Sequence, residues 1–133
     1  MASEAEAKLR EANAKFEQLQ REDEQRVRKQ GMLQKQGGGK RRANWKKRWF
    51  VLQLGKLTYY ADESKKTVKG TIDIVYDPTN RVAISDHKEH CFFITRDNAR
   101  TFFITASDDG QRNEWIKAVQ ECFQIKREQH ERA

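Results

Sequence analysis

The spacing of hydrophobic positions changes once along the chain, near residue 31. Residues 2–29 contain no Gly or Pro, and their apolar positions recur at alternating steps of three and four. This spacing predicts a helix with a narrow apolar seam, because residues three and four apart share one face of an α-helix. The predicted seam consists of Ala2, Ala5, Leu9, Ala12, Phe16 and Leu19.

The seam is short. The same register next reaches Asp23 and Arg26, so about two and a half heptads are apolar, fewer than a reliable coiled coil needs. We therefore predict that residues 1–30 form a charged helix and keep two interpretations of it open. It is either a solvated helix or a short coiled coil or docking helix, through which the chain associates with itself or with a protein partner.

After residue 31 the apolar positions alternate, and turn-forming residues separate short runs. Seven such runs predict an all-β barrel or orthogonal sandwich. Asp108 and its neighbours then offer helix-capping oxygens, and Trp115, Ile116, Val119 and Cys122 recur with a helical period. We predict a mainly β domain over residues 31–125, capped by a C-terminal helix whose Trp115 fills the open corner, and a charged tail over 126–133. The predicted strands are 32–35, 45–53, 56–60, 70–76, 81–85, 91–95 and 101–106.

The positive charge is concentrated in one segment. The 133 residues carry 27 Lys and Arg against 20 Asp and Glu, a net charge of +7, yet residues 31–60 alone hold eight basic and no acidic side chains. A field this local predicts one anionic partner: a membrane, a nucleic acid or an acidic protein. No apolar run approaches the roughly 18 to 20 residues that span a bilayer, and the N-terminus has no secretory signal pattern.

Several other functions are disfavoured. Cys91 and Cys122 lie far apart in apolar runs, which predicts buried, reduced thiols in a cytoplasmic protein. His87, His90 and His130 lack the spacing of metal ligands or of a nucleophile's base, so we expect no metal, no cofactor and no catalysis. Nucleic-acid binding is also disfavoured, because the basic residues cluster at one end of a strand pair instead of lining a long groove.

The strand pair around the Gly-rich loop carries the candidate chemistry. Alternation places Lys35 on the inner face of the first strand, and Lys46 and Arg48 on the inner face of the second. If the two strands form a hairpin, these three cations meet at its loop end, with Tyr59 of the third strand nearby. The combination suits a multiply phosphorylated small headgroup, because Arg offers paired donors, Lys a mobile charge and Tyr a hydroxyl.

The segments GMLQK (31–35), NWKKRWFVL (44–52), LTYY (57–60), KG (69–70) and EWI (114–116) together resemble a pleckstrin homology (PH) domain. The order of basic and small residues is similar to that of members that bind 3-phosphoinositides, such as the cytohesin-type domains. The resemblance implies a module that recruits its protein peripherally from the cytoplasm to the plasma membrane or another phosphoinositide-bearing membrane, in signal transduction. It implies PtdIns(3,4,5)P3 as the first ligand and PtdIns(3,4)P2 as the second. The binding residues that it implies are Lys35, Lys46, Arg48, Tyr59 and Lys69, with Lys40, Arg41 and Arg42 from the loop.

One feature departs from the cytohesin-type pattern. Those domains carry an extra hairpin between the sixth and seventh strands, whereas residues 95–100 leave room only for a tight turn. This departure leaves the preference among phosphoinositides open. The resemblance also allows an alternative function, because many domains of this fold bind lipids poorly or bind proteins instead: a protein interaction or adaptor module that binds anionic lipids only weakly and without specificity.

Overall fold

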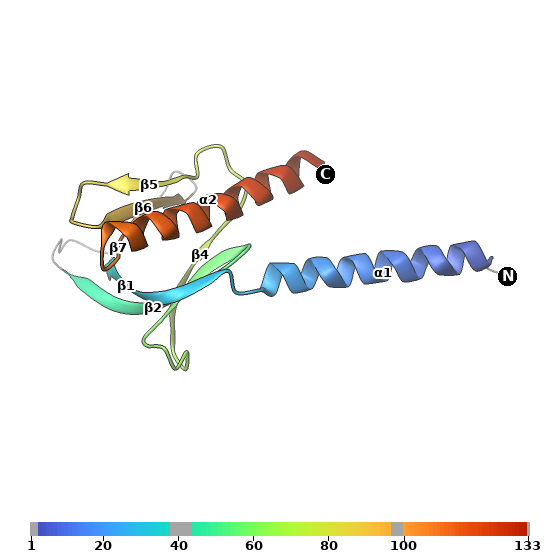
Figure 1. Cartoon of the computed structure of the whole chain (residues 1–133), viewed down its shortest axis with the longest axis horizontal. Helices are drawn as coiled ribbons and strands as arrows, with labels where there is room; N and C mark the ends of the chain where they lie inside the picture. Colours follow the sequence, from blue (N-terminus) through green and yellow to red (C-terminus); the bar gives the residue numbers. More distant parts are fainter. Residues whose placement is uncertain (1–2, 38–43, 97–99, 133) are drawn as a thin grey trace.

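The computed structural model describes residues 3–37, 44–96 and 100–132. It confirms the predicted fold class: along the chain, seven antiparallel strands follow one helix and precede another (Figure 1). The helices are α1 (Glu4–Gln25) and α2 (Asp109–Arg132). The strands are β1 (Lys29–Gln36), β2 (Trp45–Gln53), β3 (Lys56–Tyr60), β4 (Val68–Asp73), β5 (Val82–Ser85), β6 (Cys91–Arg96) and β7 (Arg100–Thr105).

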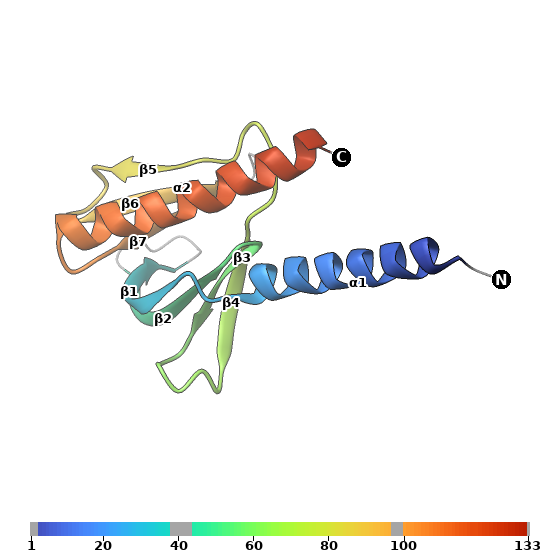
Figure 2. The same cartoon turned by 45° about the vertical axis from the view of Figure 1, so that its right-hand side comes forward.

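The seven strands form one sheet in the order β4-β3-β2-β1-β7-β6-β5. Strands β1 and β2 pair in the predicted hairpin, and Lys35 lies opposite Lys46 in their register. Helix α2 packs on β5 and β6, and α1 projects away from the sheet (Figures 1 and 2).

The core lies between the curved sheet and α2. Phe50 and Leu52 of β2 are fully buried, as are Phe92 of β6 and Ile104 of β7, because alternate side chains of each strand point inward. Trp115 of α2 completes the core. It is 2% exposed, and its ring meets that of Phe50 edge-on, with centroids 6.5 Å apart.

The ends of some elements differ from the prediction. Helix α1 ends at Gln25, earlier than the sequence pattern indicates, because Lys29 already pairs with Leu52 in the sheet. Strand β4 ends at Asp73, so residues 74–76 are not in a strand. At the start of α2 the structure confirms the capping residue: the backbone N–H of Gln111 donates to Asp108 Oδ1 at 2.7 Å.

Both cysteines are buried free thiols, as predicted. Burial raises the pKa of Cys122 to about 11. In the described part of the chain, neither helix is apolar enough over a sufficient length to span a membrane.

Candidate anion-binding site

A hollow of about 190 Å³ lies at the end of the β1–β2 hairpin. Five of the eight predicted site residues line it, and the other three, Lys40, Arg41 and Arg42, lie outside the described residues. Among the described residues, those that line the hollow are Lys35, Gly37, Lys46, Arg48, Tyr59 and Lys69. A larger hollow of about 490 Å³ lies between the β4–β5 connection and α2, but its lining mixes Asp77 with two arginines and apolar groups. The smaller hollow is therefore the stronger candidate for an anion.

Sheet register brings the predicted residues together. Lys35 of β1 lies opposite Lys46 of β2, and Arg48 follows two residues later on the same strand face. At the base of the loop the Gly37 N–H donates to the Asn44 carbonyl oxygen at 2.7 Å, which closes the hairpin below the hollow. Two adjacent strands thus deliver three cations to one place.

Tyr59 of β3 forms the next wall. Its ring contacts Phe50 with centroids 5.4 Å apart, and Gly70 of β4 is its partner in the sheet. A Cβ on residue 70 would lie 2.9 Å from Tyr59 Cε2 and closer still to Cζ and Oη. The phenol therefore occupies the space that any side chain at position 70 would need. Glycine at position 70 allows Tyr59 to lie across β4 beside Lys69.

Lys35 is the most buried cation of the site, with 7% of its surface exposed. Its ammonium group lies 5.0 Å from the Tyr59 ring centroid and 5.5 Å from that of Phe102, and it donates to the Gln36 carbonyl oxygen at 3.2 Å. Burial lowers the pKa of Lys35, and the positive charges of Arg100 and Arg48 lower it further. An anion in the hollow would oppose both effects, because a nearby negative charge favours the charged form of Lys35.

Sequence reasoning missed Arg100, the first residue of β7. Its guanidinium lies 4.3 Å from the centroid of the Phe102 ring, which the Lys35 ammonium also approaches. The signal was present in the alternation, since residues 100, 102 and 104 share one strand face and Phe102 and Ile104 are buried. The turn signals over residues 95–100 place Arg100 in a turn, so the sequence pattern does not predict its direction.

The cations of the site have no anionic partner among the residues that the structure describes. Within the described residues, no carboxylate forms an ion pair with any of the five basic side chains Lys35, Lys46, Arg48, Lys69 and Arg100. Arg48 gives one Nη1 hydrogen bond to the Lys47 carbonyl oxygen at 2.9 Å and keeps further donors. Among the described side chains, no cluster of His, Cys, Asp or Glu could hold a metal ion. The site can therefore bind an anion with several negative charges.

Comparison with known proteins identifies the family. A family model for the PH domain matches residues 27–124. Mouse Differentially expressed in FDCP 6 is 36% identical over 104 residues, which cover 78% of this chain and 16% of that protein. Mouse Switch-associated protein 70 is 39% identical over 95 residues, or 70% of this chain and 16% of that protein. The chain thus spans less than a fifth of the length of these relatives.

Solved structures agree with this assignment. The C-terminal PH domain of pleckstrin, in complex with D-myo-Ins(1,2,3,5,6)P5, aligns with a TM-score of 0.65 and 33% identity, over 74% of this chain and 96% of that one. The complex of the same domain with D-myo-Ins(1,2,3,4,5)P5 aligns with a TM-score of 0.62. The fold and these similarities agree, and the chain belongs to the PH domain family.

Proposed function

We propose that this domain binds the phosphorylated headgroup of an inositol lipid and so recruits its protein from the cytoplasm to a membrane. The observation that carries the proposal is the group of cations around one hollow, with no carboxylate partner among the described residues. The pleckstrin domain crystallised with inositol pentakisphosphates supports this ligand chemistry. We propose PtdIns(3,4,5)P3 as the preferred lipid and PtdIns(3,4)P2 as the next.

Each side chain has a distinct role in this proposal. Arg48 binds one phosphate through paired N–H donors, and the Tyr59 hydroxyl donates to a phosphate oxygen. Lys35 supplies a charge whose field is strengthened by its burial. Lys46 and Lys69 are exposed and form the rim. A ligand with several phosphates is favoured, because a single negative charge would leave most of the mutual repulsion of the cations in place.

The pocket adds selectivity to a general attraction. Each Lys or Arg near an anionic leaflet contributes roughly 1 kcal/mol to the free energy of membrane binding. This contribution depends on the surface charge of the membrane and not on the identity of the headgroup. Specific recognition must therefore be measured at constant surface charge.

A vesicle-binding panel tests the proposal. Vesicles with equal surface charge would carry phosphatidylserine, PtdIns(4,5)P2, PtdIns(3,4)P2 or PtdIns(3,4,5)P3, and the proteins would be wild type, Arg48→Ala and Lys47→Ala. Lys47 is exposed on the opposite strand face, so its substitution by alanine removes the same charge as Arg48→Ala but outside the hollow. We expect Arg48→Ala to abolish discrimination among headgroups. We expect Lys47→Ala to weaken all binding by about fivefold without changing the order. Equal binding of wild type and Arg48→Ala to every vesicle would contradict the pocket.

The exposed helix α1 favours a second candidate function, a protein interaction module with weak and unspecific binding of anionic lipids. In that case wild-type binding in the same panel would follow surface charge alone.

A further inference from the structure

Helix α1 is an exposed arm. It has 22 residues, none of them buried, and it extends away from the barrel (Figures 1 and 2). Its predicted apolar seam is open to solvent, since Leu9, Phe16 and Leu19 are 61%, 61% and 53% exposed. Large apolar side chains aligned along one face of a helix indicate an interaction surface.

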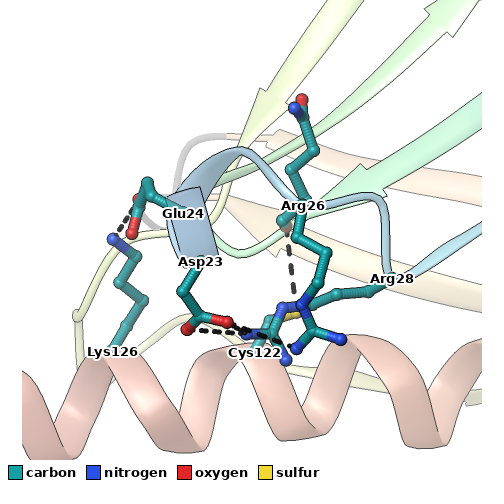
Figure 3. A network of polar contacts seen from close by, with 7 residues as sticks. Asp23, Glu24, Arg26, Arg28, Cys122 and Lys126 are labelled. Atoms are coloured by element: carbon teal, nitrogen blue, oxygen red, sulfur yellow. Dashed lines mark hydrogen bonds and ion pairs between the residues drawn. The ribbon is translucent and has the colours of Figure 1, made fainter. Parts of the chain in front are cut away.

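Polar contacts connect the base of the arm to the rest of the domain, as Figure 3 shows. Asp23 forms an ion pair with Arg28 at 3.2 Å, and Glu24 forms one with Lys126 of α2. The Gln53 side-chain amide also donates to the Gln25 carbonyl oxygen at 2.7 Å. These contacts fix the direction in which α1 leaves the barrel, and they leave the seam over residues 5–19 uncovered.

Charge argues against a membrane as the occupant of this seam. Residues 4–25 carry four basic and seven acidic side chains, a net charge of −3, and helices that lie on anionic membranes are rich in Lys and Arg. A second helix fits better. We propose that the seam is covered by α1 of a second copy of this chain, with the two helices antiparallel about a two-fold axis near residue 14. This inference does not depend on the proposed lipid function.

Side-chain size favours the antiparallel arrangement. In a heptad register Leu9 and Phe16 take position a, and Ala12 and Leu19 take position d. Antiparallel helices pair a with d, so Leu9 meets Leu19 of the second copy and Phe16 meets Ala12 of the second copy. Each layer then combines side chains of complementary volume. Parallel helices would instead oppose two Phe16 rings in one layer and two Ala12 methyl groups in another.

Charge favours the same arrangement. Lys8 and Glu22 both flank the seam at position g, and antiparallel pairing brings Lys8 of each copy beside Glu22 of the other. One unfavourable contact, Lys15 with Lys15 of the second copy, lies at the axis.

Sedimentation of the whole chain over a concentration series up to about 1 mM tests the pairing. The variants are Ala12→Glu and Ala14→Glu, which change charge and helix propensity equally but lie on opposite faces of α1. We expect wild type and Ala14→Glu to associate with increasing concentration, and Ala12→Glu to remain monomeric with unchanged helix content by circular dichroism. A wild type that stays monomeric throughout, or two variants that behave alike, would overturn the proposal.

Disulfide trapping tests the orientation. In the antiparallel pair a cysteine at position 9 lies opposite position 19, so Leu9→Cys mixed with Leu19→Cys should cross-link rapidly under mild oxidation, whereas Leu9→Cys alone should not. The natural cysteines do not interfere, because both are fully buried. Rapid cross-linking of Leu9→Cys with itself would show a parallel pair and refute the proposed arrangement.

Discussion

Substituting Gly70 by alanine would displace the Tyr59 ring while leaving every basic side chain of the site in the sequence. The new Cβ would lie 2.9 Å from Tyr59 Cε2 and closer to Cζ and Oη, whereas ordinary van der Waals contact begins at 3.4 Å. The ring must therefore move by at least 0.5 Å at Cε2. It cannot do so freely, because Phe50 packs against it with centroids 5.4 Å apart and the Lys35 ammonium lies 5.0 Å from its centroid.

Two effects should follow from Gly70→Ala. Overpacking costs about 1 to 3 kcal/mol, and each 1 kcal/mol lowers the melting temperature of a domain of this size by roughly 4 to 8 °C. Displacement of the Tyr59 hydroxyl would remove its proposed hydrogen bond to a charged phosphate, worth about 1.5 to 3 kcal/mol, so headgroup affinity should fall by about 10- to 150-fold. Calorimetric titration with the soluble headgroup of PtdIns(3,4,5)P3 and thermal unfolding measure the two effects separately.

The matched control is Gly31→Ala. A Cβ at position 31 would meet only Cζ2 of Trp115, at 3.7 Å, so it fits without displacing that ring. This variant should bind normally and unfold at the same or a slightly higher temperature, since alanine reduces the freedom of the unfolded chain. In a Tyr59→Ala background, Gly70→Ala should have no further effect on affinity. If Gly70→Ala and Gly31→Ala are indistinguishable in both assays, the proposed contact between residues 59 and 70 is wrong.

Two further predictions concern the buried titratable groups. Because the pKa of Lys35 is lowered and an anion binds its charged form, headgroup affinity should fall as the pH rises toward that pKa, and Arg100→Ala should move the fall to higher pH. Without ligand the pH dependence of folding stability has the opposite sign. Between the lowered pKa of Lys35 in the folded protein and its ordinary value of 10.5, the unfolded state binds more protons than the folded state. Chemical denaturation at several pH values should therefore show that wild type gains stability relative to Lys35→Met as the pH rises. A pKa of about 11, against an ordinary value of 9.0, predicts that Cys122 reacts with a thiol reagent at least about 100-fold more slowly in the folded protein than in denaturant; equal rates would contradict its burial.

Alternation along strands was sufficient to predict most of the described site. Two local rules predict that Lys35, Lys46 and Arg48 lie together. Side chains two residues apart share a strand face, and a hairpin aligns its two antiparallel strands. The same reasoning placed Tyr59 at the mouth. These are local rules, and the described structure follows them.

The remaining features depend on tertiary contacts that no local pattern encodes. The sequence alone does not distinguish Gly70 from any other strand glycine. Its role depends on the ring of Tyr59, its partner on β3, which occupies the space that a Cβ at position 70 would need. Arg100 was missed because β7 begins earlier than the turn signals suggest. The end of α1 at Gln25 likewise reflects pairing of the following residues with Leu52, since that pairing makes the extended conformation more favourable than a longer helix.

The two proposed interactions use separate parts of the molecule. Strand β1 connects them: it begins at Lys29, just after α1, and reaches the hollow at Lys35, six residues and about 20 Å further along. Residues 31–60 carry eight basic and no acidic side chains, whereas α1 has a net charge of −3. Positive and negative charge are therefore separated along the line from the hollow to α1. Near an anionic surface that separation turns the hollow toward the surface and keeps α1 away from it. The seam of α1 shares no residue with the hollow, so the proposed pairing leaves both hollows open. Because the proposed pair is antiparallel and each hollow lies at the end of β1 remote from α1, the two hollows lie at opposite ends of the pair (Figure 1). One flat membrane then reaches one hollow at a time, so we expect pairing to add no avidity on a single membrane.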